Sequence, residues 1–356
     1  MPGCTAIALS GGIDSLAAAA LLKDQGHRII ALHFLTGFEK SAVNEPGGQE
    51  GPEERMRRKL APLTDSLDIP LYIIDLRREF KSLVVDYFVS TYAIGRTPNP
   101  CLICNPMIKF DILLRRAAEW GADRIATGHY ARIADAGRGD KRLLRGIDPV
   151  KDQSYFLARL RREQMEKAVL PLGGMTKRQT RGIARDKGLH PAVAEESQDV
   201  CFIRDSSYAE FLSNQSGFHF RPGPIEDVSG RIIGRHQGLH RYTVGQRRGI
   251  NCPAARPFYV VRLEPDRNCL VVGGKEDLLA SECRVTQVNW ITALPREPFK
   301  AQVQVRYRHQ AVPATIIPRP EACAKVVFDA PEEAITPGQG AVFYNGDEVL
   351  GSGWIQ

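Results

Sequence analysis

The sequence predicts an α/β plus β protein, in which a doubly wound parallel sheet is followed by a small linker domain and a C-terminal β-barrel. The first half of the chain alternates short apolar strands with helices, which is typical of a parallel sheet with helices on both faces. From about Gly217 onward, short strands separated by Gly and Pro replace that alternation, as in small β-barrels. A chain of 356 residues exceeds one typical core, so we expect two or three domains.

The predicted elements follow from these patterns in order. In the first half, strands are expected at residues 6–9, 28–34, 70–75 and 124–127. Helices are expected at residues 16–24, 54–67, 80–92, 109–120, 152–170 and 177–189. The Gly-, Pro- and Glu-rich residues 44–54 are typical of a loop. In the second half, strands are expected at residues 258–263, 270–272, 301–307, 314–318, 324–328 and 341–344.

Composition narrows the class of protein. The formal net charge is +7, which suits a polyanionic partner without requiring one. Eight cysteines in 356 residues do not indicate a disulfide scaffold, so thiols, catalytic groups or metal ligands are expected. The sequence has no apolar run long enough to span a membrane and no basic leader, which predicts a cytoplasmic protein that does not bind membranes.

A glycine turn lies between the first predicted strand and helix, at Ser10-Gly11-Gly12-Ile13-Asp14-Ser15. Two glycines let the backbone approach a phosphate, and successive N–H groups at a helix start form an anion site. Asp14 would repel a bare phosphate, so we expect it beside Mg²⁺. The alternative is a turn that merely needs glycine, since neither GxxxxGK[ST] nor GxGxxG is present.

This turn resembles the pyrophosphate loop of the N-type ATP pyrophosphatases, which implies an adenine nucleotide alpha hydrolase-like sheet and adenylation of a carbonyl oxygen by ATP. That superfamily includes both amide-forming synthetases and thiolating enzymes. The loop alone therefore does not identify the reaction.

The positions of the cysteines indicate which of them could take part in the chemistry. Cys101 and Cys104 form a Cys-x-x-Cys pair in a proline-rich loop that leads into a helix, where the helix N-terminus would favour a thiolate. Cys201 lies within an apolar, strand-like segment. The remaining cysteines are expected to be small buried hydrophobes: Cys4, Cys252, Cys269, Cys283 and Cys323.

The surrounding strings are similar to those of the tRNA-specific 2-thiouridylases, in the same order along the chain. They are TPNPCLICN with IKF at 97–110, ATGHYA at 126–131, KDQSYFL at 151–157, CFI at 201–203, GL with YTVGQRRG at 238–249, RYR at 306–308 and PGQ at 337–339. The resemblance implies a catalytic domain at residues 1–205 that includes a helical tRNA-contacting segment. It also implies a central β domain at 206–280 and a tRNA-binding barrel at 281–356.

The resemblance implies a reaction as well. ATP with Mg²⁺ adenylates O2 of the wobble uridine (U34), and sulfur from a persulfide on Cys201 replaces that oxygen, with Cys104 as the nucleophile. The implied ATP contacts are Ala8, Leu9, Ser10, Gly11, Gly12, Ile13, Asp14, Ser15, Phe34 and Gly128. The implied tRNA contacts are Asn99, Pro100, His129, Lys151, Asp152, Gln153, Arg306, Tyr307 and Gln339. The implied partners are the tRNAs for Lys, Glu and Gln and a sulfur donor, either a cysteine desulfurase or a relay protein.

Two positions depart from that family. Phe34 stands where a methionine is usual, and Cys101 stands where an aspartate is usual. Cys101, Cys104 and Cys201 could together hold three irons of a [4Fe–4S] cluster with the fourth iron open, which is an alternative route for the same thiolation. A zinc site is a further option, because Cys-x-x-Cys is also a zinc half-site.

Two functions from other classes also compete. An ATP-dependent amide-forming synthetase would share the glycine turn, but no glutaminase signature is evident and the site cysteines would have no role. A non-catalytic RNA-binding protein would not need the intact glycine turn.

Overall fold

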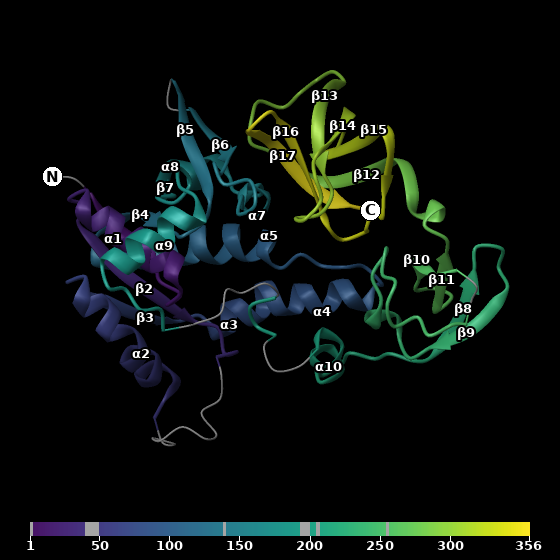
Figure 1. Ribbon diagram of the computed structural model, residues 1–356, viewed down its shortest axis with the longest axis horizontal. Coiled ribbons are helices and arrows are strands. Elements are labelled where there is room, and N and C mark those ends of the chain that lie inside the picture. Colours follow the sequence, from purple (N-terminus) through teal and green to yellow (C-terminus); the bar gives the residue numbers. More distant parts are fainter. Residues whose placement is uncertain (1–2, 40–49, 138–139, 193–199, 204–206, 254–255) are drawn as a thin grey trace. The chain divides into compact units, whose positions relative to one another are not determined.

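The computed structural model describes residues 3–39, 50–137, 140–192, 200–203, 207–253 and 256–356 (Figure 1). The chain divides into two compact units. Unit 1 comprises Met1–Val84, Cys101–Arg204 and Asp347–Val349. Unit 2 comprises Val85–Pro100, Asp205–Gly346 and Leu350–Gln356. The predicted domain limits at 205/206 and 280/281 stay predictions, and the division into units adds that Val85–Pro100 fold with the second half of the chain.

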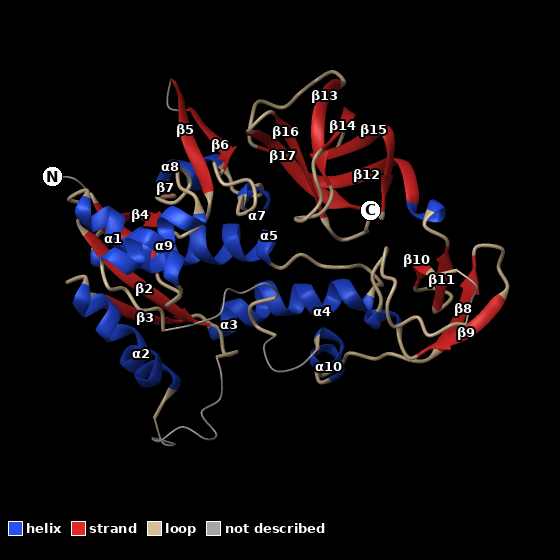
Figure 2. Cartoon of the chain, in the orientation of Figure 1, coloured by secondary structure: helices blue, strands red, loops and turns tan. Residues whose placement is uncertain are grey.

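Unit 1 is built on a parallel sheet with the strand order β3-β2-β1-β4-β7 (Figure 2). Its strands are β1 (Cys4–Ala8), β2 (Ile29–Leu35), β3 (Leu71–Asp75), β4 (Ala122–Ala126) and β7 (Ala168–Val169). Each neighbouring pair is parallel. The order runs outward from β1 in both directions, which confirms the doubly wound prediction. The loops after β1 and β4 therefore meet at the switch point, where open α/β sheets bind ligands.

The helices of this half agree largely with the predictions; most begin a few residues earlier, whereas α9 begins at the predicted Lys177 and ends at Asp186. They are α1 (Ile13–Asp24), α2 (Pro52–Ser66), α3 (Arg77–Phe80), α4 (Asp86–Ala93), α5 (Cys101–Cys104), α6 (Leu113–Ala117), α7 (Ser154–Leu157), α8 (Arg162–Lys167) and α9 (Lys177–Asp186). A π-helical segment, Lys81–Val85, joins α3 to α4, and another, Asn105–Ile112, joins α5 to α6. Each predicted helix at 80–92 and 109–120 is thus part of a longer helical run.

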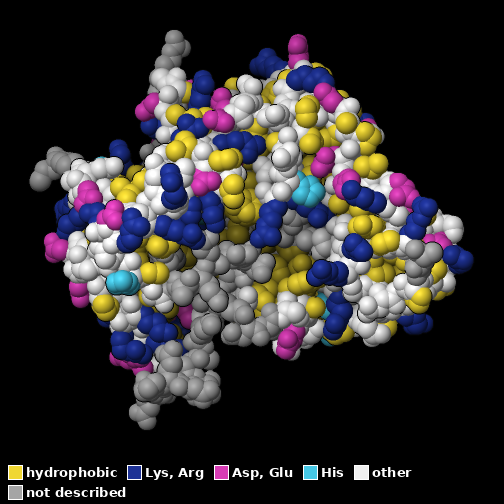
Figure 3. Space-filling view, in the orientation of Figure 1, with side chains coloured by type: hydrophobic (Ala, Val, Ile, Leu, Met, Phe, Trp, Pro, Cys, Tyr) yellow, Lys and Arg dark blue, Asp and Glu magenta, His cyan; other side chains and the backbone are white. Residues whose placement is uncertain are grey.

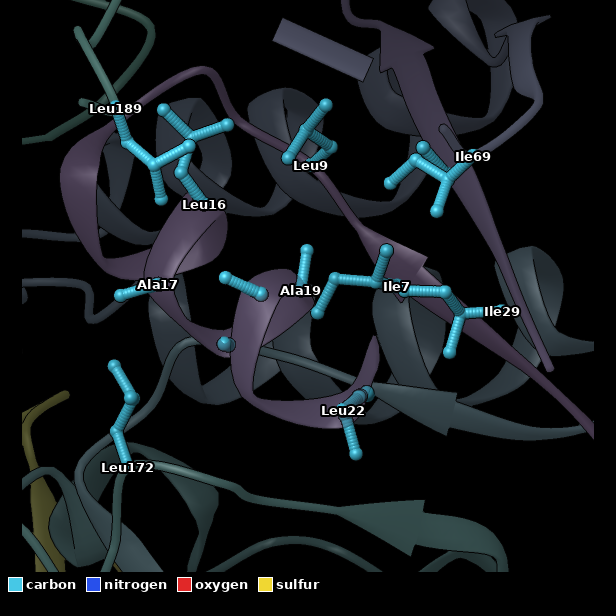
Figure 4. Close-up of a cluster of buried hydrophobic side chains, with 14 of the residues drawn as sticks. Ile7, Leu9, Leu16, Ala17, Ala19, Leu22, Ile29, Ile69, Leu172 and Leu189 are labelled. Carbon is cyan, nitrogen blue, oxygen red and sulfur yellow. The ribbon is translucent and has the colours of Figure 1, made fainter. Parts of the chain in front are cut away.

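The core of unit 1 lies between α1 and the sheet (Figure 4). Leu16 and Leu22 of α1 are buried, together with Ile7 of β1 and Ile29 of β2. Four alanines in a row, residues 17–20, let the helix lie close to its neighbours. Burial of a side chain such as Leu16 contributes about 2 kcal/mol. This packing fixes the start of α1, and hence the glycine turn, relative to β1.

The predicted helix at residues 152–170 is wrong. The structure has the short helices α7 and α8 there, followed by β7. The carboxylate of Asp152 accepts hydrogen bonds from the Gly146 and Ser154 N–H groups, which makes the start of this region a turn. At the other end, Ala168 adopts an extended conformation, because Ala168–Val169 pair with β4 at the edge of the sheet.

Two further regions of unit 1 differ from or lie beyond the predictions. The hairpin β5 (Ala131–Gly137) and β6 (Asp140–Arg145) is antiparallel, and the sequence patterns did not indicate it. Of the predicted loop at residues 44–54, residues 44–49 lie outside the described residues, and α2 already begins at Pro52.

Unit 2 contains a small sheet and a barrel. The small sheet has the strand order β10-β11-β8-β9, from β8 (Gly223–Asp227), β9 (Ile232–His236), β10 (Tyr259–Glu264) and β11 (Cys269–Gly273). The helix α10 (Tyr208–Ser213) precedes it in the chain. The core of this sheet includes Ile225, Val260 and Leu270.

The barrel is antiparallel and follows the order β12-β15-β14-β13-β16-β17. Its strands are β12 (Leu279–Trp290), β13 (Phe299–Gln304), β14 (Val312–Arg319), β15 (Cys323–Glu333), β16 (Gly340–Asn345) and β17 (Glu348–Ile355). Pairing of β12 with β17 closes it, which leaves no open edge and confirms the predicted C-terminal barrel. Among the described residues, no helix is long and apolar enough to cross a membrane.

Candidate functional site

The glycine turn connects β1 to α1, and its shape depends on its own residues. Gly11 has φ +79°, a left-handed conformation that glycine adopts without strain. Ser15 Oγ donates to the Gly12 carbonyl oxygen (2.9 Å) and accepts from the Ser10 N–H (3.3 Å). These bonds hold the turn open at the helix start, where the first N–H groups of α1 have no partner within the helix. The turn therefore offers N–H donors and the positive end of a helix dipole to an anion.

Gly128 lies against this turn from the loop after β4. A Cβ atom on Gly128 would come within 2.8 Å of the Asp14 carbonyl carbon and 2.9 Å of the Ser15 nitrogen, so only glycine fits there. Phe34 is half-buried near the end of the neighbouring strand β2. The structure thus gathers the predicted ATP contacts at the carboxyl ends of β1, β2 and β4.

Asp14 has partners that the sequence did not reveal. Lys177 Nζ lies 2.8 Å from each of its carboxylate oxygens, and the Tyr130 hydroxyl donates to Oδ1 at 2.8 Å. The Lys177 side chain is only 8% exposed. Where the sequence placed Mg²⁺, the structure therefore has an ammonium group. No local signal marks Lys177, because it contacts a residue 163 positions away in the chain.

Cys101 and Cys104 lie in the first helical turn after the proline-rich segment, as α5. We expected the helix start to favour their thiolates, and this is wrong, because burial dominates. Burial raises the pKa of Cys101 to about 11 and that of Cys104 to about 12, with a smaller rise in both from the neighbouring Cys201. Both are therefore thiols near neutral pH.

Lys109 opposes this effect. Its charge lowers the pKa of both Cys101 and Cys104, although less than burial raises them. Burial, and then the same lysine, hold the pKa of His129 well below its ordinary value. The His129 ring is therefore neutral at pH 7, with Nδ1 2.7 Å from Thr127 Oγ1. The sequence marks Lys109 only as part of the IKF string, and the structure adds it to the site.

Cys201 lies in a turn, so the expected strand-like segment is wrong. The Ile203 N–H donates to the Val200 carbonyl oxygen at 3.0 Å, which reverses the chain around Cys201. Phe202 is 4% exposed and packs against Phe38 and Phe80, with ring centroids 5.6 and 5.7 Å away. Cys201 itself is exposed. A buried aromatic ring thus anchors a turn that presents the thiol to solvent.

The cysteines form neither a disulfide nor a metal site. None of the eight is part of a disulfide. Among the described residues, which include Cys101, Cys104 and Cys201, no group of three His, Cys, Asp or Glu side chains is arranged to hold a metal ion. As placed, the three cysteines do not form a ligand set for the alternative iron–sulfur cluster or for a zinc ion.

Several predicted tRNA contacts gather in unit 2 around the segment before Cys101. Gln339 Nε2 donates to the Thr97 and Pro98 carbonyl oxygens at 3.1 and 3.0 Å. A Cβ atom on Gly338 would lie 2.8 Å from the Thr97 oxygen, so the barrel turn at 337–339 lies directly on this segment. The Asn99 N–H donates to the Tyr87 hydroxyl (3.3 Å), and Asn99 is buried. Pro100, the next residue of this segment, is buried as well.

Arg306 and Tyr307 follow strand β13 in unit 2. Arg306 donates to the Val244 carbonyl oxygen (2.5 Å) and to the Thr336 hydroxyl. The Tyr307 carbonyl oxygen accepts from Gln304 (2.7 Å), and its ring is half-buried. The Arg306 side chain therefore links the 243–246 loop to the base of the 336–339 turn.

The remaining predicted tRNA contacts lie in unit 1, in the turn before α7. The Asp152 carboxylate is already bound within the protein, because it also accepts from the Ser154 hydroxyl and pairs with Arg145 at 3.0 Å. Gln153 and Tyr130 bond reciprocally, with the Tyr130 N–H on Gln153 Oε1 (3.0 Å) and the Gln153 N–H on the Tyr130 oxygen (2.8 Å). This pair ties the turn to the loop that carries His129. Lys151 is half-buried beside them.

Three known domain families match the chain in succession. The tRNA methyl transferase HUP domain matches residues 4–205, the tRNA methyl transferase PRC-barrel domain matches 209–274, and the aminomethyltransferase beta-barrel domain matches 280–355. Together they cover nearly the whole chain. A HUP domain fits the use of ATP.

Curated relatives match over almost the full length. The tRNA-specific 2-thiouridylase MnmA of Desulfosudis oleivorans is 50% identical over 351 residues, which are 99% of this chain and 94% of the relative. The protein of the same name from Geobacter metallireducens is 45% identical over 98% of this chain and 95% of its own. That from Syntrophotalea carbinolica is 44% identical over 98% and 97%.

Proposed function

This chain belongs to the tRNA-specific 2-thiouridylases and is an enzyme that forms 2-thiouridine in tRNA, and we propose that it thiolates the wobble uridine through ATP activation and a persulfide on Cys201. The observation that carries the mechanism is electrostatic. Cys201 lies near enough to Cys101 and Cys104 to raise the pKa of both, although 97 residues separate Cys104 from Cys201. The amide-forming and non-catalytic alternatives have no comparable support.

The first step uses the glycine turn. The N–H groups at the start of α1 bind ATP phosphates, and O2 of the uridine attacks the α-phosphate, so that pyrophosphate leaves and the uridine carries AMP on O2. Gly11, Gly12 and Gly128 keep the backbone accessible. AMP is a good leaving group, which a free carbonyl oxygen is not.

Mg²⁺ would accompany ATP, where it would neutralise phosphate charge. Asp14, the ligand expected from the sequence, does not fit that role as placed, because Lys177 and Tyr130 already occupy its oxygens. We therefore assign Asp14 and Lys177 to holding the glycine turn against α9, and no step is assigned to the metal.

The second step transfers sulfur. A donor loads Cys201, whose exposure gives a cysteine desulfurase or a relay protein access to its sulfur. The terminal persulfide sulfur attacks C2 of the uridine and AMP leaves. The Cys104 thiolate then attacks Cys201 Sγ, which forms a Cys104–Cys201 disulfide and leaves the terminal sulfur on C2. An external thiol reduces the disulfide before the next turnover. In a second order of events, Cys104 attacks the persulfide first and the released hydrosulfide attacks C2.

The tRNA contacts divide between two kinds of role. Lys151, His129 and Tyr307 are assigned to direct contact, with neutral His129 suited to a base rather than a phosphate. Arg306 and Gln339 are assigned to positioning the 336–339 turn and the 97–98 segment, because their side chains donate to neighbouring groups there. Asp152 and Gln153 are assigned to holding the turn and the His129 loop, since their side chains are bonded internally. The expected substrates are the tRNAs for Lys, Glu and Gln.

The test is direct. The purified protein, ATP, a persulfide donor and each of the three tRNAs should give 2-thiouridine by nucleoside mass analysis, with AMP and pyrophosphate. Cys104→Ser and Cys201→Ser should abolish 2-thiouridine but retain tRNA-dependent ATP–pyrophosphate exchange. Thiolation by Cys201→Ser at the wild-type rate would overturn the relay.

A further inference from the structure

We propose that a basic groove in unit 1, between the turn at residues 148–151 and helix α9, binds the phosphate backbone of the tRNA substrate. The identity of the polyanion rests on the proposed function. The groove encloses about 1030 Å³. Five of its nine lining residues are Lys or Arg and one is acidic. Lys177 is paired with Asp14, and the charge of the other four, Lys151, Arg178, Arg181 and Arg185, is complementary to a chain of phosphates.

The arginines of the groove share one face of α9. Arg178, Arg181 and Arg185 are spaced three and four residues apart, which places them on the same side of a helix. All three are exposed, whereas Thr180 and Ala184 on the opposite face are buried. Figure 3 shows Lys and Arg side chains gathered over α9. The helix thus presents a row of guanidinium groups, which recognise phosphate with paired donors.

Asp148 is the one acidic residue of the groove, and its carboxylate is already hydrogen-bonded to backbone N–H groups. Asp148 Oδ2 accepts the Lys177 N–H at the start of α9 (2.9 Å), and Oδ1 accepts the Val150 N–H (3.1 Å). The carboxylate therefore joins the turn at residues 148–151 to the start of α9, which are the two walls of the groove. Val150, 82% exposed, leaves apolar surface at the mouth of the groove against which a ribose can pack.

Gly182 leaves open space on the side of α9 that faces the groove. Glycine inside a helix costs stability relative to alanine, so it needs a reason. No atom lies within 4 Å of the position that a Cβ on Gly182 would occupy, and its φ is not positive, so neither internal packing nor backbone conformation requires it. A side chain there would project into the groove that Arg178 and Arg181 line. Gly182 keeps that space open.

The groove also lies beside the glycine turn and the loop that carries His129. Lys177 begins α9 at the groove, and its Nζ reaches Asp14 in the glycine turn. On the other wall, Lys151 is two residues from Gln153, which is bonded to Tyr130 next to His129. A phosphate backbone in the groove would therefore run past both the nucleotide loop and the neutral histidine.

The first test removes charge. In Arg178→Ala/Arg181→Ala, the Kd for tRNA should rise about tenfold near physiological salt, and the slope of log Kd against log salt should fall by about two, one for each lost phosphate contact. ATP binding measured without tRNA should stay unchanged, and the loss of activity should appear mainly as a higher KM for tRNA. Arg178→Lys/Arg181→Lys should restore the salt slope. The matched control Arg57→Ala/Arg58→Ala, on α2, should bind tRNA as the wild type does.

The second test fills the groove without changing charge. Gly182→Gln should weaken tRNA binding severalfold while raising the thermal stability of the protein, because Gln is the better helix former. An unchanged Kd and salt slope in both sets of variants would overturn the proposal. Failure of the proposed function would look different: the wild type would bind tRNA, lose affinity through these substitutions, and yet form no 2-thiouridine.

Discussion

The Nζ atom of Lys177 lies 2.8 Å from both carboxylate oxygens of Asp14, which joins the start of α9 to the glycine turn. The lysine side chain is 8% exposed and the aspartate side chain 31% exposed, so the pair is largely removed from water. Such a pair adds little net stability when intact but costs much when one partner is lost.

The first prediction concerns that pair. Lys177→Met should destabilise the protein by about 2 kcal/mol and raise the KM for ATP, because Asp14 is left beside the phosphate site without its counter-charge. Urea unfolding and ATP–pyrophosphate exchange measure the two effects. Lys177→Met/Asp14→Asn should recover most of the stability. If the double variant is less stable than both single variants, the two residues do not act as a pair.

The second prediction is a pH dependence. The pKa of Cys104 is raised to about 12, so its thiolate is scarce at pH 7 and increases tenfold with each pH unit. The single-turnover rate of disulfide formation from persulfide-loaded enzyme should therefore rise with pH, with a slope near one, between roughly pH 6 and 9. Quenched-flow measurement on the preformed adenylate isolates this step. A flat profile would mean that Cys104 does not attack as a thiolate in the step that limits the rate.

The third prediction concerns Lys109, whose charge lowers the pKa of Cys104. Lys109→Met should raise that pKa further, so the same single-turnover rate should fall about threefold at pH 7. Lys109→Arg keeps the charge and should react like the wild type. Equal rates for the Met and Arg variants at every pH would show that the charge has no effect on the thiol.

The fourth prediction concerns the anchor of Cys201. Phe202→Ala removes a buried ring from its contacts with Phe38 and Phe80 and should cost about 3 kcal/mol of stability. Thiolation should fall more than loading of the persulfide, because the exposed thiol stays accessible but its turn is no longer held. Phe202→Leu should retain most of both. Parallel loss of loading and thiolation would contradict a positioning role.

The fifth prediction addresses Cys101, which stands where the family usually has aspartate. Cys101→Asp should thiolate tRNA with a persulfide donor, and wild-type protein purified without oxygen should do so with less than about one iron per chain. Iron and sulfide analysis beside the activity assay decides this. About four irons per chain, with activity that disappears on their removal, would favour the cluster route instead.

Local signals explain what the sequence predicted well. Three adjacent segments follow one another in the chain: the apolar run of β1, the two glycines and the alanine-rich α1. Their order alone predicts a strand, a turn that can bind phosphate, and a helix. Closure of the barrel followed from the spacing of short strands and turn residues. The strand, the turn and the helix depend on near neighbours in the chain. The barrel was indicated by a repeated local pattern of strands and turns, although its closing pair joins residues as far apart as Val285 and Ile355.

The features that were missed depend on distant residues. Lys177 meets Asp14 across 163 positions. The turn at Asp152 is the exception: its partners Gly146 and Arg145 are only six and seven residues away, but a side-chain bond to the backbone leaves no mark in the hydrophobic pattern. The thiol pKa values show a different limit. The helix start near Cys101 and Cys104 was visible in the sequence, but the burial that outweighs it appears only once the fold is complete.

The pairing of β12 with β17 has a consequence for the order in which the protein matures. Strand β12 leaves the ribosome some 60 residues before β17, and until β17 arrives the barrel has two unpaired edges. The turn at 337–339, which lies on the Thr97 segment, can be set only shortly before that closure. The catalytic sheet, complete with β7, can fold much earlier during synthesis. The nucleotide-binding sheet of a nascent chain can thus fold well before the barrel does. If synthesis stopped early, we expect a fragment that binds ATP and carries an incomplete barrel, whose unpaired strand edges would promote aggregation.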